Sequence, residues 1–293
     1  IVAAENPGLV YCEISGFGRT GPYAGRAGFD LVAQGMSGLM SVTGEGPGRP
    51  PVKVGGPVSD ITAGILGAMG VLAALQERQR TGRGQRVDTS LFEAAITHTY
   101  WQSAISMATG TPPGPMGSAH PLSAPYQAFE TTDGWLVLGA ANQNTWTRLL
   151  DVIETPAIAD DARFVDNAGR MANLAALEEA LAAVFKGGAR DDWLARLEAA
   201  GVPAGPVLNI AEMHADPQVV ARGMVVETEH DRLGPVATIG LPVKFSETPG
   251  HVAFAAPDYG QHTREVLAEY GYDGAAIDDL VASGAAVAGV TEE

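Results

Sequence analysis

The sequence predicts an α/β protein whose large domain is interrupted by a small α+β domain. The strand-like run 9–15 enters a glycine-rich turn, and segments with helical apolar spacing follow it. The Gly/Pro-rich stretch 110–117 marks a domain boundary, and Asp133-Gly134 beyond it separates two strand-like runs, which is typical of a hairpin. We therefore expect a first part of the large domain at 1–113, the small domain at 114–205 and a return segment completing the large domain at 206–293.

The first third of the chain predicts three helices. Apolar spacing places one at about 30–40, and a second runs from Asp60 to about Arg80. A third is expected from Ser90 to about Ala108, because Ser90 and Glu93 have the spacing of a capping box.

The rest of the chain predicts shorter elements. The hairpin strands are expected at 126–131 and 135–140, and Gly201 is expected to end the last helix of the small domain. The remaining expected elements are helices at 145–153, 174–185 and 191–200, then a strand at 206–208, a helix at 210–214, strands at 224–229 and 236–239, and a final helix at 261–270.

Composition restricts the class of function. The 293 residues carry 34 acidic and 18 basic side chains, a formal charge of −16, which disfavours binding to nucleic acid or to anionic membrane. The sequence has no uninterrupted apolar run of membrane-spanning length, so we expect no membrane partner. The one cysteine, Cys12, excludes an internal disulfide and a cysteine-built metal site, and we expect a cytoplasmic protein without a bound metal.

The most informative segment is the glycine-flanked helix start around Asp60. Either Ser59 or Asp60 is predicted to cap the first turn, where free N–H groups and the helix dipole favour an ionised carboxylate. The following small residues, Ala63, Gly64, Gly67 and Ala68, leave room for a ligand or another backbone. Asp60 is therefore a candidate nucleophile, with a plain helix cap as the alternative.

Three other motifs have functional and structural interpretations. Gly16, Gly18 and Gly21 match a dinucleotide-binding pattern with Glu45 as the ribose acid, but Pro22 interrupts the helix that this pattern requires. The arginines 78, 80, 83 and 86 either meet phosphates or complement a helix C-terminus. His120, in a loop of small residues at the domain boundary, is either a donor over a pocket or simply solvated.

Several motifs together resemble the class III CoA-transferases, the CaiB/BaiF type that includes formyl-CoA transferase. The likeness rests on the order and spacing of these segments and extends nearly to the C-terminus. They are Asn6–Tyr11, Ser15–Tyr23, Arg26–Asp30, Asp60, Thr81–Gln85, Gly201–Val207, Asp216–Gln218 and Gly260–Thr263.

The resemblance implies a Rossmann-like large domain and a reaction at Asp60. In the family, the aspartate at this position attacks the thioester of an acyl-CoA to give an aspartyl anhydride, which CoA reopens as an enzyme-CoA thioester. The acceptor carboxylate then takes the CoA, so CoA is part of the substrate and no tightly bound cofactor is expected. The implied acyl-group contacts are Asp30, Gly117, Ser118 and His120, and the implied CoA contacts are Arg26, Gly28 and Phe29.

The resemblance also sets expectations for substrate and assembly. The segment Gly117–Pro121 is similar to dicarboxylate-using members such as succinate–hydroxymethylglutarate CoA-transferase. The related α-methylacyl-CoA racemases, an alternative that we rank below transfer, have a histidine in the segment where this chain has Gly28-Phe29-Asp30, and Phe29 cannot exchange a proton. The family's N-terminal segment has no counterpart here, so we expect an N-terminally truncated member, with a non-catalytic CoA-binding fragment as an alternative. The family implies an interlocked homodimer.

Overall fold

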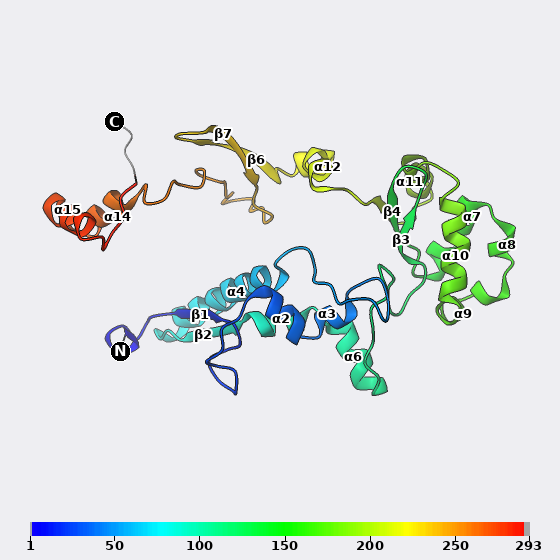
Figure 1. Ribbon diagram of the computed structural model, residues 1–293, viewed down its shortest axis with the longest axis horizontal. Coiled ribbons are helices and arrows are strands. Elements are labelled where there is room, and N and C mark those ends of the chain that lie inside the picture. Colours follow the sequence, from blue (N-terminus) through cyan, green and yellow to red (C-terminus); the bar gives the residue numbers. More distant parts are fainter. Residues whose placement is uncertain (1, 290–293) are drawn as a thin grey trace. The chain divides into compact units, whose positions relative to one another are not determined.

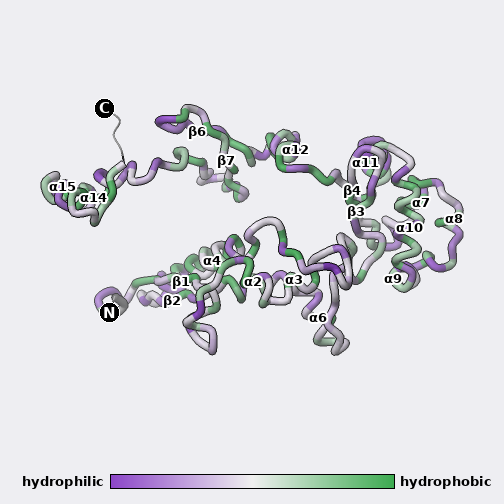
Figure 2. The backbone as a smooth tube through the Cα atoms, in the orientation of Figure 1, coloured by the Kyte–Doolittle hydropathy of each residue, from purple (hydrophilic) through white to green (hydrophobic). Residues whose placement is uncertain are grey.

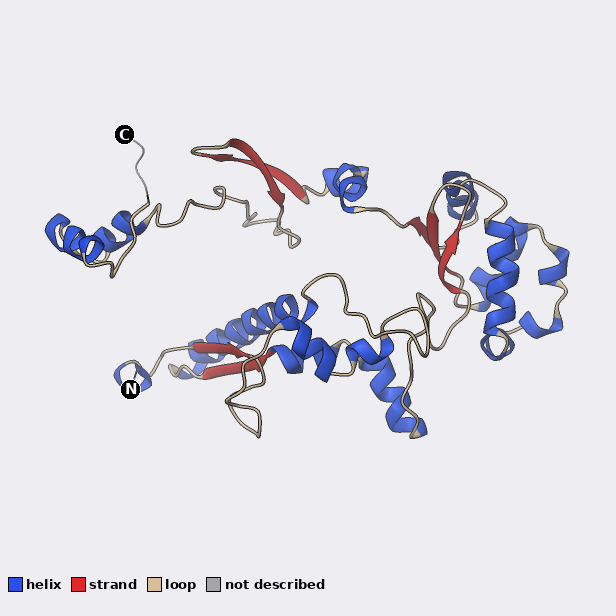
Figure 3. Ribbon diagram, viewed as in Figure 1, coloured by secondary structure: helices blue, strands red, loops and turns tan. Residues whose placement is uncertain are grey.

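The computed structural model describes residues 2–289 and divides into two compact units, one up to residue 207 and one from residue 208. In the first unit the chain passes through a parallel strand pair with helices and then through a helix-rich small domain (Figures 1 and 3). The second unit contains short helices and one hairpin. Each unit is described by itself.

A parallel pair of strands organises the start of the first unit. After the short helix α1 (Val2–Glu5), β1 (Tyr11–Ser15) pairs with β2 (Arg86–Ser90) from Tyr11 opposite Arg86 to Ser15 opposite Ser90. Parallel strands need a crossover, and the crossover here contains α2 (Asp30–Met36), α3 (Leu39–Val42) and α4 (Val58–Thr81). Helix α4 packs against both strands.

The sequence prediction missed β2 and merged neighbouring helices. Gly38 has φ 87°, so the helix expected at 30–40 is divided into α2 and α3. Ser90 does cap a helix, since its Oγ accepts the Glu93 N–H at 3.1 Å. That helix breaks at residues 98–99 into α5 (Leu91–Thr97) and α6 (Tyr100–Thr109).

The fold class is therefore mixed α/β. Within residues 2–289 the parallel sheet contains β1 and β2 alone. The Rossmann-like arrangement of the large domain stays a prediction.

The small domain contains the main hydrophobic core of the first unit. Strands β3 (Tyr126–Glu130) and β4 (Trp135–Gly139) form the expected hairpin, and β5 (Ala204–Pro206) pairs antiparallel with β4. Phe129, Leu136 and Leu149 are at most 2% exposed in this core. The helices are α7 (Gln143–Ile153), α8 (Pro156–Ala159), η1 (Ala162–Phe164), α9 (Asn167–Ala172), α10 (Leu174–Phe185) and α11 (Arg190–Ala199), and Gly201 follows α11 with φ 66°.

The second unit is built from two helix pairs and a hairpin. Helices α12 (Ile210–Ala215) and α13 (Pro217–Ala221) precede the antiparallel strands β6 (Val225–His230) and β7 (Gly234–Ile239). The expected final helix is α14 (Thr263–Glu269), and a further helix, α15 (Gly274–Ala282), follows it. The sequence prediction missed α15.

Helix α4 is the one helix among residues 2–289 with the length and apolar composition of a membrane span. Figure 2 colours this helix by hydropathy. Its most apolar stretch of 18 residues has a mean hydropathy of 1.8, and 22% of that stretch is buried. Glycines and alanines are frequent in this stretch. The same small residues lie against the strands, because a Cβ at Gly70 would stand 2.5 Å from Val87 Cγ1.

Candidate functional site

Asp60 lies in the first turn of α4 and is exposed. The loop before it contains Gly55 and Gly56, and an added Cβ at either would have no atom within 4 Å. The same holds for Gly64, one turn further along the helix. The Asp60 carboxylate therefore stands beside open space at the positive end of a long helix.

The cap of α4 differs from the sequence prediction. Pro57 occupies the N-cap and makes no side-chain cap hydrogen bond. Ser59 is fully buried, and its Oγ has no hydrogen-bond partner among residues 2–289. The cap comes from another helix, since Asp30 Oδ1 at the start of α2 accepts the Ser59 N–H at 2.9 Å. Sequence spacing could not reveal a cap contributed from 29 residues away.

The small residues after Asp60 do not form one open face. Ala63 is fully buried, and a Cβ at Gly67 would lie 3.0 Å from Ile14 Cδ1 of β1. These two residues let α4 approach the sheet closely, whereas Gly64 is open. The expectation of ligand access holds for Gly64 and is wrong for Ala63 and Gly67.

The predicted CoA contacts lie in the loop before α2. Gly28 and Gly16 touch through their backbones, because a Cβ on Gly28 would be 2.8 Å from Gly16 Cα. Phe29 is the extended N-cap residue of α2 and is 77% exposed. The Arg26 guanidinium is exposed and lies 4.1 Å from the centroid of the Tyr23 ring.

The loop containing Gly117, Ser118 and His120 is held by hydrogen bonds to backbone groups of other segments. The Gly117 N–H donates to Gly44 O at 2.8 Å, and Ser118 Oγ accepts the Ala128 N–H at 2.9 Å. Such contacts fix the loop at both of these positions.

His120 is half-buried between two aromatic rings. Its ring centroid lies 4.8 Å from that of Trp101 and 5.2 Å from that of Tyr126. Its Nδ1 accepts the Leu122 N–H at 3.1 Å, so the neutral ring carries its proton on Nε2. His120 can therefore present a hydrogen-bond donor. Neither aromatic partner was singled out by the sequence analysis.

The predicted site residues thus form three groups, one of which is Arg26, Gly28 and Phe29 in the loop before α2. Asp30 contacts the first turn of α4, which carries Asp60, and Gly117, Ser118 and His120 lie together at the domain boundary. The sequence analysis missed Gln34, which is fully buried beside Asp30, and the Thr62–His98 pair, joined by 2.8 Å between Oγ1 and Nε2. The i, i+4 spacing of Asp30 and Gln34 was the available signal.

The alternative motifs are explained by local structure. The next helix after Gly21 begins at Asp30, so the dinucleotide pattern lacks the helix start that would hold a pyrophosphate. Arg80 pairs with Glu77, and Arg78 donates to Gly8 O at 3.2 Å. Within residues 2–289 no group of three or more His, Cys, Asp or Glu side chains could hold a metal ion.

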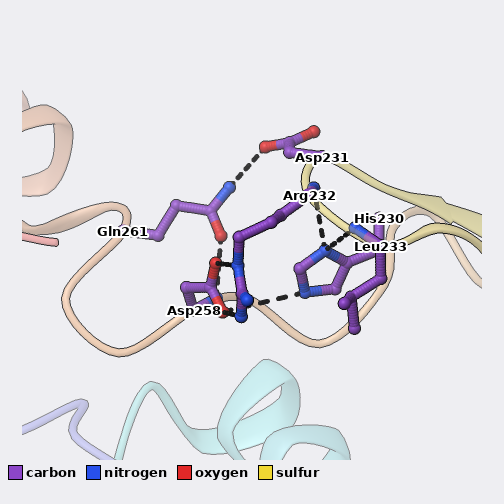
Figure 4. Close-up of polar contacts among 6 residues, drawn as sticks. All are labelled: His230, Asp231, Arg232, Leu233, Asp258 and Gln261. Atoms are coloured by element: carbon purple, nitrogen blue, oxygen red, sulfur yellow. Dashed lines mark hydrogen bonds and ion pairs between the residues drawn. The ribbon is translucent and has the colours of Figure 1, made fainter. Parts of the chain in front are cut away.

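The second unit contains a separate polar cluster (Figure 4). His230 Nδ1 accepts the backbone N–H groups of Arg232 and Leu233 at 3.1 and 3.3 Å, which closes the turn between β6 and β7. Arg232 donates two hydrogen bonds to Asp258, at 2.9 and 3.1 Å, and thereby lowers the pKa of that carboxyl group. This cluster ties the hairpin to the segment before α14.

The chain is similar to known proteins along most of its length. The model of the family described as CoA-transferase family III matches residues 1–263. A succinate–glutarate CoA-transferase of Agrobacterium fabrum is 39% identical over 90% of this chain, and a succinyl-CoA:glutarate CoA-transferase of Mus musculus is 34% identical over 95% of it. The chain spans 66% and 64% of the length of these two relatives.

A solved structure supports the same fold. A CaiB/BaiF family protein from Brucella suis matches with a TM-score of 0.78 and 39% identity. The match covers 92% of this chain and 69% of that one.

Proposed function

The chain belongs to CoA-transferase family III, and from this premise we propose that it moves CoA from an acyl-CoA thioester to a free carboxylic acid, with Asp60 as nucleophile. The observation that carries the proposal is the position of Asp60. Its carboxylate is exposed in the first turn of α4, and open space surrounds the glycines on both sides of it. A carboxylate that can be approached is what attack on a thioester requires.

The proposed reaction has two matching halves. An Asp60 oxygen attacks the thioester carbonyl, the C–S bond breaks, and a mixed anhydride and CoA thiolate result. The thiolate then attacks the Asp60 carbonyl and releases the first acid, leaving an Asp60–CoA thioester. In the second half, the acceptor carboxylate attacks the Asp60–CoA thioester, which gives a second mixed anhydride and CoA thiolate. The thiolate then attacks the acceptor's carbonyl, so that the new acyl-CoA leaves and Asp60 returns as a carboxylate. No redox change occurs.

We propose a dicarboxylic acid as one substrate. The names of the two relatives give succinate or succinyl-CoA together with glutarate. Succinate and glutarate are both dicarboxylic acids. His120 supports this choice, because a ring with its proton on Nε2 offers a donor to a second carboxylate. Gly117 and Ser118 belong to the same proposed acyl-binding loop.

The proposed CoA contacts are Arg26, Gly28 and Phe29. An exposed guanidinium suits a phosphate group, and an exposed aromatic ring suits the adenine. The Gly28 backbone lies in close contact with Gly16, which shapes the loop that joins these side chains.

We further propose a cytoplasmic, interlocked homodimer in which residues 206–293 complete the Rossmann-like large domain. Ile61, Ile65, Met69 and Leu72 of α4 are all more than half exposed, and this apolar face supports a protein partner for the helix. Its first turn carries the acidic Asp60 and its last turn the basic Arg78 and Arg80. These charges interact favourably with the helix dipole at both ends. Partners are then acyl-CoA, a carboxylic acid and a second copy, without nucleic acid or membrane.

The test is transfer between defined substrates. The chain is mixed with succinyl-CoA and glutarate, and glutaryl-CoA is measured by chromatography. Loss of a covalent nucleophile is expected to lower the rate of Asp60→Ala by at least about a thousandfold. Asp192→Ala, which removes an exposed first-turn carboxylate from α11, is the matched control and should keep its activity.

Three outcomes would contradict the proposal. Full activity of Asp60→Ala would remove Asp60 from the chemistry. Exchange of the α-proton of a 2-methylacyl-CoA without any acceptor acid would instead indicate a racemase, and CoA binding without transfer would indicate a non-catalytic fragment.

A further inference from the structure

Helix α4 begins without a cap of its own. The first N–H groups of a helix need acceptors from outside its hydrogen-bond ladder. Pro57 makes no side-chain cap hydrogen bond, and the Ser59 hydroxyl is buried without a partner in the described part of the chain. The acceptor for the Ser59 N–H is Asp30 Oδ1, at 2.9 Å.

The second oxygen of Asp30 is also occupied. Gln34, one turn further along α2, donates from Nε2 to Asp30 Oδ2 at 2.7 Å. The other end of the same amide, Oε1, accepts the Val54 N–H at 2.9 Å. Gln34 is 0% exposed, and only this orientation of its amide satisfies both partners.

The Asp30–Gln34 pair therefore joins three segments. These are α2, the loop through Val54, and the first turn of α4. The capped N–H belongs to Ser59, and the next residue in the chain is Asp60. A shift of this turn would move the Asp60 carboxylate with it, and small displacements of a reacting group are costly.

We propose that Asp30 and Gln34 are positioning residues that act through the Ser59 N–H to hold the first turn of α4, and with it Asp60. The proposal rests on the proposed function, in which Asp60 is the nucleophile. It changes the role expected for Asp30, because both of its carboxylate oxygens are used inside the protein. The role of Gln34 is new.

An exchange of hydrogen-bonding groups tests this directly. Asp30→Asn places a second NH2 group against Gln34 Nε2, and Gln34→Glu places a second carboxylate against Asp30. The double substitution, Asp30→Asn with Gln34→Glu, restores a donor facing an acceptor and keeps acceptors for Ser59 and Val54. Each single change is expected to lower the rate of Asp60 acylation about tenfold, as expected when a hydrogen bond to a charged group is lost. The double variant should return to within about threefold of the original chain.

Two readouts are measured on each variant. Hydrogen exchange of the amides at 58–62 reports whether the turn is held, and it does not depend on activity. Mass spectrometry of the Asp60 peptide after a brief exposure to succinyl-CoA and hydroxylamine reports acylation. The matched control is Asp273→Ala, which removes a cap with the same 2.9 Å geometry from α15. It should change exchange near residue 276 and leave acylation unchanged.

Each outcome decides a separate claim. If the double variant recovers both readouts, the positioning role stands. If it recovers neither, or recovers exchange without acylation, the proposal is overturned, the latter result showing that Asp30 acts on substrate directly. If the unsubstituted chain never acquires a label on Asp60, the proposed function fails instead, and the exchange data still show whether Asp30 and Gln34 hold the turn.

Discussion

The small domain and helix α4 use apolar residues in opposite ways. In the small domain Leu136, Leu149 and Phe185 are 0% exposed and belong to one continuous core. In α4 four large apolar residues are more than half exposed, namely Ile61 (57%), Ile65 (56%), Met69 (60%) and Leu72 (67%). The small domain is thus stabilised by its own packing, whereas α4 turns its small residues to the sheet and has an apolar face that nothing covers within the first unit as described.

The largest expected effect is a difference in the free energy of unfolding between two truncations to alanine, one in each region. Phe185→Ala should lower the free energy of unfolding by about 3–5 kcal/mol, because it leaves a cavity in a closed core. Leu72→Ala should change it by no more than about 0.5 kcal/mol, since its side chain is 67% exposed. Denaturant unfolding measures both. Equal losses would show that α4 is already covered in the isolated chain.

A smaller effect tests the close backbone contact beside α2. Gly28→Ala should cost about 2 kcal/mol, because the new Cβ would stand 2.8 Å from Gly16 Cα, which is backbone and cannot rotate away. Gly25→Ala, in the same loop, would meet no atom within 4 Å and is the control. Thermal unfolding of the two variants should differ. A neutral Gly28→Ala would mean that the loop moves freely and that the contact does not shape it.

The cap of α4 predicts a still smaller pair of effects. Asp30→Ala should cost about 1 kcal/mol, the usual value for a lost helix cap. Ser59→Ala should cost nothing, because the hydroxyl that it removes has no partner within residues 2–289. A larger loss of stability from Ser59→Ala than from Asp30→Ala would indicate that Ser59 caps the helix, which the sequence offered as one possibility.

The second unit extends the comparison to a region that depends on polar contacts. Ile277 is its one buried apolar side chain within residues 208–289. The pKa of Asp258 is lowered, first by its hydrogen bond from Arg232, so this contact stabilises the unit above the ordinary carboxyl pKa of 3.8 and is lost as the pH falls through the lower folded value.

The corresponding measurement is hydrogen exchange of residues 258–262 between pH 5 and pH 2.5. After correction for the intrinsic pH dependence of amide exchange, the protection of these amides should persist at pH 5 and disappear only near pH 2.5. Asp258→Asn should show the unprotected behaviour at pH 5. Because these side chains are exposed, the effect should also weaken with added salt. A pH-independent protection would remove the carboxylate from the account of this unit.

The sequence predicted features that depend on neighbouring residues. The hairpin around Asp133-Gly134, the stop at Gly201 and the Ser90 cap follow from local chemistry, and the structure contains all three. The family resemblance came from motif order and is confirmed by the family match.

Features that depend on distant residues were missed. Strand β2 exists because residues 86–90 pair with β1, more than 70 residues earlier. The cap from Asp30 and the buried Gln34 likewise require α2 and α4 to meet, and no spacing rule predicts that meeting. Asp60 could be selected from its motif, whereas the residues that hold it could be found only in the folded chain.

The most direct test of the account is the site of covalent labelling. The chain is mixed with succinyl-CoA, trapped with hydroxylamine and digested, and the modified peptide is sequenced by mass spectrometry. The account predicts a hydroxamate on Asp60 and none in Asp60→Ala. A hydroxamate on another carboxylate, or transfer to glutarate with no covalent label at any point, would contradict it.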